Sequence, residues 1–402
     1  MYRIKFFSNK ITLLFLLAIL ISSVEVNAQK KKERVSSGAF TSYDKIFKGN
    51  INDINLADYA DGPHFFWVDS KLVKSWYVDH KQEGNTITIR EKKIKVKGDS
   101  VLVKGQKGDS NRYWLRKGEY PVQESEYTGV KKLLAIGDVH GEYDVMVELL
   151  QNNGVINEDL DWSWGDGHLI FIGDIFDRGD KVTESLYLIK KLQRQAIAQK
   201  GRLHLILGNH EVMILMNDSR YAAPKYKNMC KRLMVNYPRF FAADTELGKW
   251  LRSLNSVVKI NDLIFVHGGL SPDLVERGLS LKQINDDIRN SLRADNEMSH
   301  EEVMKTTYFP ENPLWYRGYI MKSRSYSIVN NEELDRVLSF YKAKRIFFGH
   351  TEVESIRFIH NNKVGAINVP MGYSEIKPQV LCVENDVFYR CFIDGEKEKI
   401  EL

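Results

Sequence analysis

The sequence predicts an α/β (α+β) fold in which mixed β-sheets stack between helices, preceded by a small antiparallel β domain. Two observations carry this prediction. Before Gly129, short β-rich runs are separated by turn signals, and after it apolar strands alternate with helical segments. Of the 402 residues, 43% are hydrophobic and 28% are charged, so the chain can fill a sizeable core and is not a disordered protein. Its length allows two or three domains of about 150 residues each.

The N-terminus, residues 1–28, is predicted to be a signal peptide. Basic residues precede the apolar run 11–21, and Val26, Asn27 and Ala28 form a small-residue cleavage site. The apolar run is shorter than the about 20 residues that a membrane-spanning helix needs, although an uncleaved anchor or a buried helix is the alternative. We therefore expect an exported protein, periplasmic or secreted, with no stable membrane span after cleavage.

Charge and cysteine content exclude two classes of protein. The net charge of +5 is too diffuse to indicate a nucleic-acid partner, and three cysteines are too few for a disulfide scaffold. A hairpin turn at Asn385-Asp386 would place Cys382 opposite Tyr389 and Cys391 one diagonal step away. Diagonal neighbours lie about 7–8 Å apart, so we expect buried free thiols here and at Cys230.

Residues 38–125 are predicted to form the small β domain. Turn signals around 83–85 and 98–99 separate its β-rich runs, which are 64–69, 72–80, 86–90, 94–96, 101–104 and 113–116. Its aromatic residues either form the core of a small sheet, which is the favoured interpretation, or a recognition surface; they are Phe65, Phe66, Trp67, Trp76, Tyr77 and Trp114.

After Gly129, each apolar strand ends in glycine or histidine followed by polar residues. These strands are 132–136, 168–172, 203–207, 263–266 and 345–348. Helices are expected after the first strand, through Val145 and Leu149, and over 183–199 after the second. The runs 364–369, 380–383 and 387–392 are expected to be antiparallel strands.

Metal-ligating side chains dominate the five strand ends. The motifs are Gly137-Asp138-Val139-His140-Gly141, Gly173-Asp174-Ile175-Phe176-Asp177-Arg178-Gly179, Gly208-Asn209-His210-Glu211, His267-Gly268-Gly269 and Gly349-His350-Thr351. One histidine after a strand is usually structural, but these strand ends hold four of the ten histidines in the chain. Because loops converge outside the carboxyl edge of such a sheet, the pattern predicts one shared site.

This donor set favours a pair of metal ions. Carboxylate, amide and imidazole ligands suit borderline ions such as Mn, Fe or Zn, in divalent or trivalent form. Six or more ligands are too many for one tetrahedral ion, whereas two ions about 3.5–4 Å apart use them with one bridging carboxylate. Such a pair lowers the pKa of a shared water and, with a nearby arginine, suits phosphoester hydrolysis.

The five motifs resemble the calcineurin-like metallophosphoesterase superfamily and its phosphoprotein phosphatase branch. The runs 208–213 and 313–318, together with Arg220-Tyr221, are similar to the Shewanella-like protein phosphatases. The resemblance covers residues 131–394 and implies a metallophosphoesterase domain built as a mixed β-sandwich flanked by helices. It also implies a metal-bridging hydroxide that attacks phosphorus directly, without a phosphoenzyme.

The resemblance implies a role for each site residue. Asp138, His140 and Asp174 would hold the first metal, and the bridging Asp174 would hold the second with Asn209, His267 and His350. His210 would be the general acid, oriented by Asp177. Arg178 and Arg317 would bind the phosphate oxygens, although Arg317 lies far from the other motifs and could instead be a surface or salt-bridge arginine.

Two departures from the family leave the substrate open. The chain has Val212-Met213 where the eukaryotic enzymes have Ser-Arg, and its C-terminal loop, 369–374, lacks their signature. A serine/threonine protein phosphatase-like enzyme is the favoured interpretation. The first alternative is a hydrolase of nucleotides, dinucleoside polyphosphates or other small phosphoesters. A non-catalytic receptor for metal or phosphate is the less favoured alternative.

Overall fold

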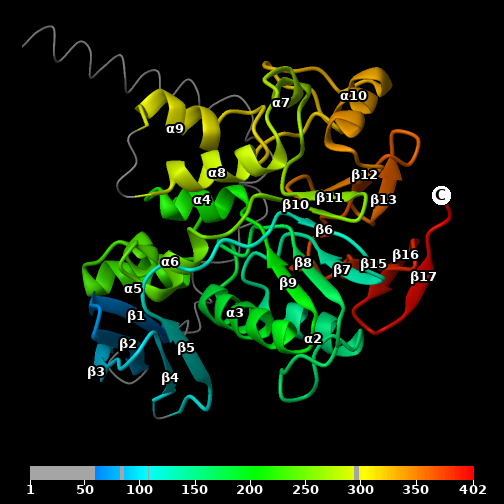
Figure 1. Cartoon of the computed structure of the whole chain (residues 1–402). Helices are drawn as coiled ribbons and strands as arrows, with labels where there is room; N and C mark the ends of the chain where they lie inside the picture. Colours follow the sequence, from blue (N-terminus) through cyan, green and yellow to red (C-terminus); the bar gives the residue numbers. More distant parts are fainter. Residues whose placement is uncertain (1–58, 82–85, 107, 294–297) are drawn as a thin grey trace, which may run out of the picture. The chain divides into compact units, whose positions relative to one another are not determined.

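The computed structural model describes residues 59–81, 86–106, 108–293 and 298–402, which belong to one compact unit (Figure 1). The predicted signal peptide, 1–28, lies outside these residues, as does the first part of the predicted β domain. None of the helices in the described ranges is long and apolar enough to cross a membrane.

Two six-stranded sheets form the centre of the molecule. The first has the order β17-β16-β15-β7-β8-β9. Its strands are β7 (Lys132–Ile136), β8 (His168–Phe171), β9 (Arg202–Leu205), β15 (Gln379–Glu384), β16 (Val387–Phe392) and β17 (Lys397–Lys399). The second has the order β13-β14-β12-β11-β10-β6. Its strands are β6 (Glu126–Tyr127), β10 (Val257–Ile260), β11 (Leu263–Val266), β12 (Arg345–Phe348), β13 (Arg357–Ile359) and β14 (Val364–Ala366).

Parallel pairing aligns the carboxyl ends of the predicted strands. Strands β7, β8 and β9 are parallel neighbours in the first sheet, and β11 and β12 are parallel in the second. The C-terminal strands β15 and β16 pair antiparallel, as predicted. The prediction that 364–369 is an antiparallel strand is confirmed only in part. β14 is antiparallel to β13 but parallel to β12, because the chain passes from β12 to the edge strand β13 and returns as β14 between them.

Helices cover the sheets, which confirms the predicted mixed sandwich flanked by helices. In Figure 1, α2 and α3 lie beside the first sheet, and α7 to α10 lie on the side of the second. Contacts join α3 to β9 and α8 to β10. The helices are α2 (Tyr143–Asn152), α3 (Val182–Ala198), α4 (Asn209–Leu215), α5 (Pro224–Leu233), the 3-10 helix η4 (Tyr237–Phe241), α6 (Glu246–Leu251), α7 (Pro272–Glu276), α8 (Leu281–Ser291), α9 (His300–Thr307) and α10 (Asn331–Tyr341).

The N-terminal β-rich part contains the predicted strands. A three-stranded antiparallel sheet consists of β1 (Asp61–Asp69), β2 (Leu72–Lys81) and β3 (Thr86–Lys95), and β4 (Ser100–Lys104) pairs with β5 (Arg112–Arg116). The predicted runs 86–90 and 94–96 form the single strand β3 and the residue after it. Phe65, Phe66 and Tyr77 are buried, as expected for core aromatics, whereas Trp114 is 39% exposed.

A buried carboxylate joins this β-rich part to the helices. Glu246, the first residue of α6, is 0% exposed. Its carboxylate accepts hydrogen bonds from Trp67 Nε1 at 2.8 Å, Arg116 N at 3.0 Å and the Tyr120 hydroxyl, and Lys190 Nζ from α3 lies at 3.2 Å. The described part of the predicted domain 38–125 thus lies in one compact unit with residues 131–394, and the division into two domains stays a prediction.

The disulfide between Cys382 and Cys391 corrects the expectation of free thiols. Cys382 pairs with Tyr389 in the β15–β16 register, as predicted. The diagonal Cα–Cα distance is 6.2 Å, however, which lies within the range that disulfides span. The right-handed twist of paired strands shortens one diagonal of a hairpin, and the flat-sheet distance ignored this effect. Cys230 is free and buried, as expected.

Replacing Glu246 with alanine should destabilise the protein strongly. Lys190 would lose its carboxylate partner, and Trp67 Nε1, Arg116 N and the Tyr120 hydroxyl would lose their acceptor, which we expect to lower the free energy of unfolding by about 3–5 kcal/mol. Urea denaturation measures this loss. Glu148→Ala on the exposed face of α2 is the control, with an expected change within about 0.5 kcal/mol. A loss of less than about 1 kcal/mol for Glu246→Ala would contradict this role.

Candidate metal centre

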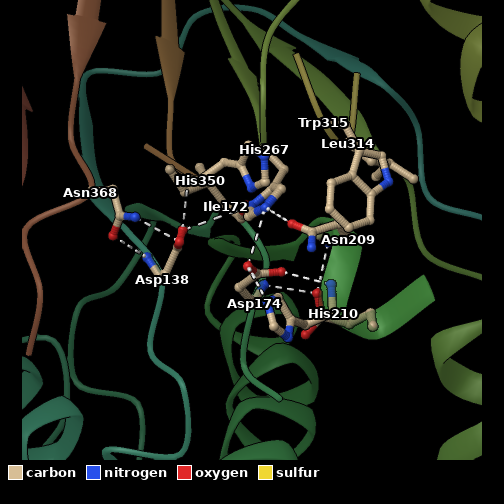
Figure 2. Close-up of polar contacts among 12 residues, drawn as sticks. Asp138, Ile172, Asp174, Asn209, His210, His267, Leu314, Trp315, His350 and Asn368 are labelled. Atoms are coloured by element: carbon tan, nitrogen blue, oxygen red, sulfur yellow. Dashed lines mark hydrogen bonds and ion pairs between the residues drawn. The ribbon is translucent and has the colours of Figure 1, made fainter. Parts of the chain in front are cut away.

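The strand ends bring the predicted metal ligands to one place, as Figure 2 shows for Asp138, Asp174, Asn209, His267 and His350. Two groups of residues could each hold a metal ion, and within each group the candidate ligand atoms lie within 4.8 Å of one another. The first group is His140, Asp174 and His210, and the second is Asp174, His267 and His350. Because Asp174 belongs to both groups, its carboxylate lies at the centre of the site.

Left-handed backbone turns aim these side chains. The site residues with positive φ are His140 (48°), Asp174 (53°), Asp177 (70°), Arg178 (64°) and His350 (58°). This conformation is unfavourable for residues other than glycine, and it persists only where the surrounding structure imposes it. Such strain clusters at functional sites, where it serves to orient side chains.

Two glycines allow the carboxylates to approach the neighbouring backbone. A Cβ atom at Gly349 would lie 2.6 Å from Asp138 Oδ1, and one at Gly208 would lie 2.6 Å from Asp174 N. Both distances are shorter than real Cβ contacts allow. Any larger residue at either position would therefore displace a carboxylate of the site.

Within the described ranges, His140 and His350 present an unpartnered Nε2 to the centre, whereas His267 Nε2 lies 2.8 Å from Asn209 Oδ1. Nδ1 of His140 donates to the Phe176 carbonyl at 2.7 Å, and Nδ1 of His267 donates to the Ile172 carbonyl at 2.8 Å. Such bonds fix the tautomer in which Nε2 carries the lone pair that a metal needs. Among the described residues, the buried Nε2 atoms of His140 and His350 have no hydrogen-bond partner. The donor set therefore fits metal ions.

The Asp174 carboxylate faces three imidazoles. Its Oδ2 lies 3.3 Å from His267 Nε2 and 3.8 Å from the Nε2 atoms of His140 and His210. Burial alone would raise the pKa of Asp174, but the charges of His267 and His210 hold it well below its usual range. This low pKa keeps Asp174 ionised, which suits a metal ligand. Burial raises the pKa of Asp138 to about 6.

His210 and Asp177 form a buried pair. His210 Nδ1 donates to Asp177 Oδ2 at 2.6 Å. Burial lowers the pKa of His210, but Asp174 and Asp177 raise it more, so the net shift is upward. The pair therefore favours an imidazolium whose Nε2–H points toward Asp174.

The two predicted arginines also lie at the site. Arg178 donates from Nη1 to Glu352 Oε1 at 3.0 Å. Arg317, remote in sequence, donates from Nη1 to the His350 carbonyl at 2.7 Å and to Thr351 Oγ1 at 3.1 Å. Both guanidinium groups are therefore anchored beside metal-ligand candidates rather than on a remote surface.

Two residues that support the site had no predicted role. Asn368 donates from Nδ2 to Asp138 Oδ2 at 2.6 Å, and its Oδ1 accepts from Asp138 N at 3.2 Å. Glu211 is 0% exposed and accepts from the backbone N–H groups of Asp174 at 2.8 Å and Gly208 at 2.7 Å. The position of Asn368 just after β14, at the end of another apolar strand, was the signal that could have identified it.

Known proteins are similar to this chain in sequence and in fold. The calcineurin-like phosphoesterase family model matches residues 131–354. Shewanella-like protein phosphatase 1 of Plasmodium berghei is 29% identical over 286 residues, which cover 68% of this chain and 78% of the relative. Shewanella-like protein phosphatase 2 of Arabidopsis thaliana is 25% identical over 317 residues, 66% of this chain and 78% of the relative. The crystal structure of a cold-active protein-tyrosine phosphatase from a psychrophilic Shewanella species is 32% identical, with a TM-score of 0.74, and covers 85% of this chain and 99% of that chain.

Replacing Asn368 with leucine should weaken metal binding. Asp138 would lose the amide that orients it, and the loss of such outer partners costs about 10–100-fold in metal affinity. Titration of metal-free protein with Mn²⁺ measures the change. Asn290→Leu on the exposed face of α8 is the control and should bind like the wild type. An Asn368→Leu protein with wild-type affinity would show that Asp138 needs no such support.

Proposed function

The chain belongs to the calcineurin-like phosphoesterase family and is a phosphatase of the Shewanella-like type; on that premise we propose that it is a two-metal phosphomonoesterase acting on phosphorylated proteins. The position of Asp174 carries this proposal, because its carboxylate lies near the candidate ligand His140 and also near the candidate ligands His267 and His350. A shared carboxylate is the feature that two neighbouring ions need.

Each metal has a set of ligands in this proposal. Asp138, His140 and Asp174 would hold the first ion, and Asp174 would hold the second together with Asn209, His267 and His350. The ions are Mn, Fe or Zn, which suit mixed oxygen and nitrogen donors. When bound, the pair supplies an activated water for direct attack on phosphorus and positive charge against the phosphate oxygens.

The protein's own residues bind the phosphate and protonate the leaving group. Arg178 and Arg317 present planar guanidinium groups, which match phosphate oxygens better than an ammonium does. His210 donates the proton on Nε2 to the departing alkoxide, while Asp177 on Nδ1 keeps the ring charged and correctly turned.

The proposed substrates are phosphoserine and phosphothreonine in proteins. One observation favours phosphotyrosine as a second candidate: the Tyr221 ring lies 5.4 Å from the His210 ring, and the Trp315 ring lies 5.7 Å from that of His350. These aromatic residues flank the two halves of the site and offer flat surfaces for an aryl group. The solved Shewanella relative is itself named a protein-tyrosine phosphatase.

Export is part of the proposal. The predicted signal peptide supports it, and cleavage would leave a mature chain that begins near Gln29. Mass spectrometry of the protein from periplasmic and medium fractions tests this. A chain recovered only from the cytoplasm, with residues 1–28 still attached, would contradict export.

Substrate profiling tests the function. We expect phosphopeptides to be hydrolysed with a higher kcat/KM than nucleotides or dinucleoside polyphosphates, with Mn²⁺, Fe²⁺ or Zn²⁺ added. Peptides that carry phosphoserine, phosphothreonine or phosphotyrosine distinguish the two protein substrates. Faster turnover of nucleotides would favour a small-molecule hydrolase, and bound metal without any turnover would favour a receptor.

Replacing His210 with alanine should slow the hydrolysis of alkyl phosphate esters more than that of aryl phosphate esters. A serine alkoxide needs a proton to leave, so we expect a loss of about 10²–10⁴-fold in kcat on a phosphoserine peptide. A phenolate leaves more easily, so the loss on p-nitrophenyl phosphate should be smaller. His300→Ala, exposed at the start of α9, is the control and should change neither rate. Equal losses on both esters would exclude His210 as the general acid.

A further inference from the structure

A buried aspartate of β1 reaches the segment that follows the loop 177–180. Asp61 is fully buried, and its Oδ2 accepts from His64 Nε2 at 2.8 Å and from Thr183 Oγ1 at 3.2 Å. Thr183 is the second residue of α3, directly after that loop. The β1–β3 sheet, which supplies no ligand to the metal centre, is therefore bonded to the helix that follows this loop.

A buried lysine contacts both Asp61 and the loop 177–180. Nζ of Lys225, in the first turn of α5, donates to the Asp180 carbonyl at 2.8 Å and lies 4.0 Å from Asp61 Oδ1. The neighbouring Tyr226 hydroxyl donates to the same carbonyl at 2.9 Å and accepts from Val182 N at 2.8 Å. The Lys225 side chain is only 8% exposed, and two carboxylates make its burial tolerable: Asp61 at 4.0 Å and Glu184 at 3.9 Å.

The loop held in this way carries two residues of the proposed mechanism. Asp177 and Arg178 both have left-handed backbone, with φ of 70° and 64°. Such a conformation persists only where the surrounding structure imposes it. Within the loop, Gly179 N donates to the His140 carbonyl at 2.8 Å, and Arg178 N donates to the Tyr221 carbonyl at 3.3 Å. At the C-terminal end of the loop, Lys225 and Tyr226 both donate hydrogen bonds to the Asp180 carbonyl.

We propose that Lys225, compensated by Asp61, is a positioning residue for Arg178 and Asp177. Through this pair the β1–β3 sheet takes part in phosphate binding, although it lies outside the metal centre. The inference rests on the proposed function, because it assigns Arg178 to the phosphate. A small displacement of such a group is enough to lower catalytic efficiency severely.

The chain offers a closely matched control. Lys249 is also buried, at 14% exposure of its side chain, and donates from Nζ to the carbonyls of Arg116 at 2.7 Å and Gly118 at 3.0 Å. It also has a buried carboxylate nearby, Glu246 at 3.8 Å. Lys249 thus has the same chemistry as Lys225 but bonds to the end of β5 and to Gly118 just after it, instead of the loop 177–180.

The test compares Lys225→Met with Lys249→Met, alone and in combination with Arg178→Ala. We expect Lys225→Met to raise the KM for p-nitrophenyl phosphate about tenfold, with a smaller change in kcat. In the Arg178→Ala background the same change should alter KM less than about twofold, because the group it positions is gone. Lys249→Met should lower Tm but leave KM unchanged.

Amide hydrogen exchange gives a second readout that needs no catalysis. In Lys225→Met, the amides of Arg178 and Gly179 should exchange faster, and they should be unaffected in Lys249→Met. If Lys225→Met does not fold, Asp61→Asn takes its place in both measurements. Equal KM values for the two lysine variants, or an undiminished effect in the Arg178→Ala background, would overturn the inference. An inactive wild type with these exchange differences would instead overturn the proposed function.

Discussion

The ionised carboxylate of Asp174, buried among three imidazoles, is the constraint on which the site depends. Its Oδ2 faces His140, His210 and His267, and its backbone is held by the carboxylate of Glu211. A buried carboxylate is tolerated only when positive or hydrogen-bonding groups surround it. The ends of strands from both sheets supply these groups, and left-handed backbone at His140 and at Asp174 itself orients two of the side chains.

The surrounding parts of the molecule act by orienting a few charged groups. Hydrogen bonds orient His210 on Asp177, Arg178 on Glu352, and Asp138 on Asn368. The same principle extends outward, because buried charges also join the N-terminal sheets to the helices. Glu246 does so at α6, whereas the pair of Asp61 and Lys225 does so beside the loop of Arg178. Buried polar contacts, as well as the apolar core, therefore fix the positions of the charged groups at the site.

Local sequence patterns revealed most of the site, because apolar strands ending in Gly-Asp or His-Gly are visible without the fold. Arg317 could be placed only through a resemblance, and its bond to the His350 carbonyl depends on distant chain segments. Capping boxes such as Ser280 with Gln283 marked short helices that the strand pattern did not reveal. The Cys382–Cys391 disulfide and the Asp61–Lys225 pair depend on strand twist and tertiary packing, which spacing along the chain does not encode.

Metal analysis of the Asp174→Ala variant tests the central claim most directly. Wild-type protein should hold about two ions per chain, and the variant should lose metal together with hydrolysis, because one carboxylate serves both ions. His210→Ala is the informative comparison, since it should keep both ions if His210 acts on the leaving group rather than as a ligand. An Asp174→Ala protein that retains two ions and a near-normal rate would contradict a centre built on a shared carboxylate.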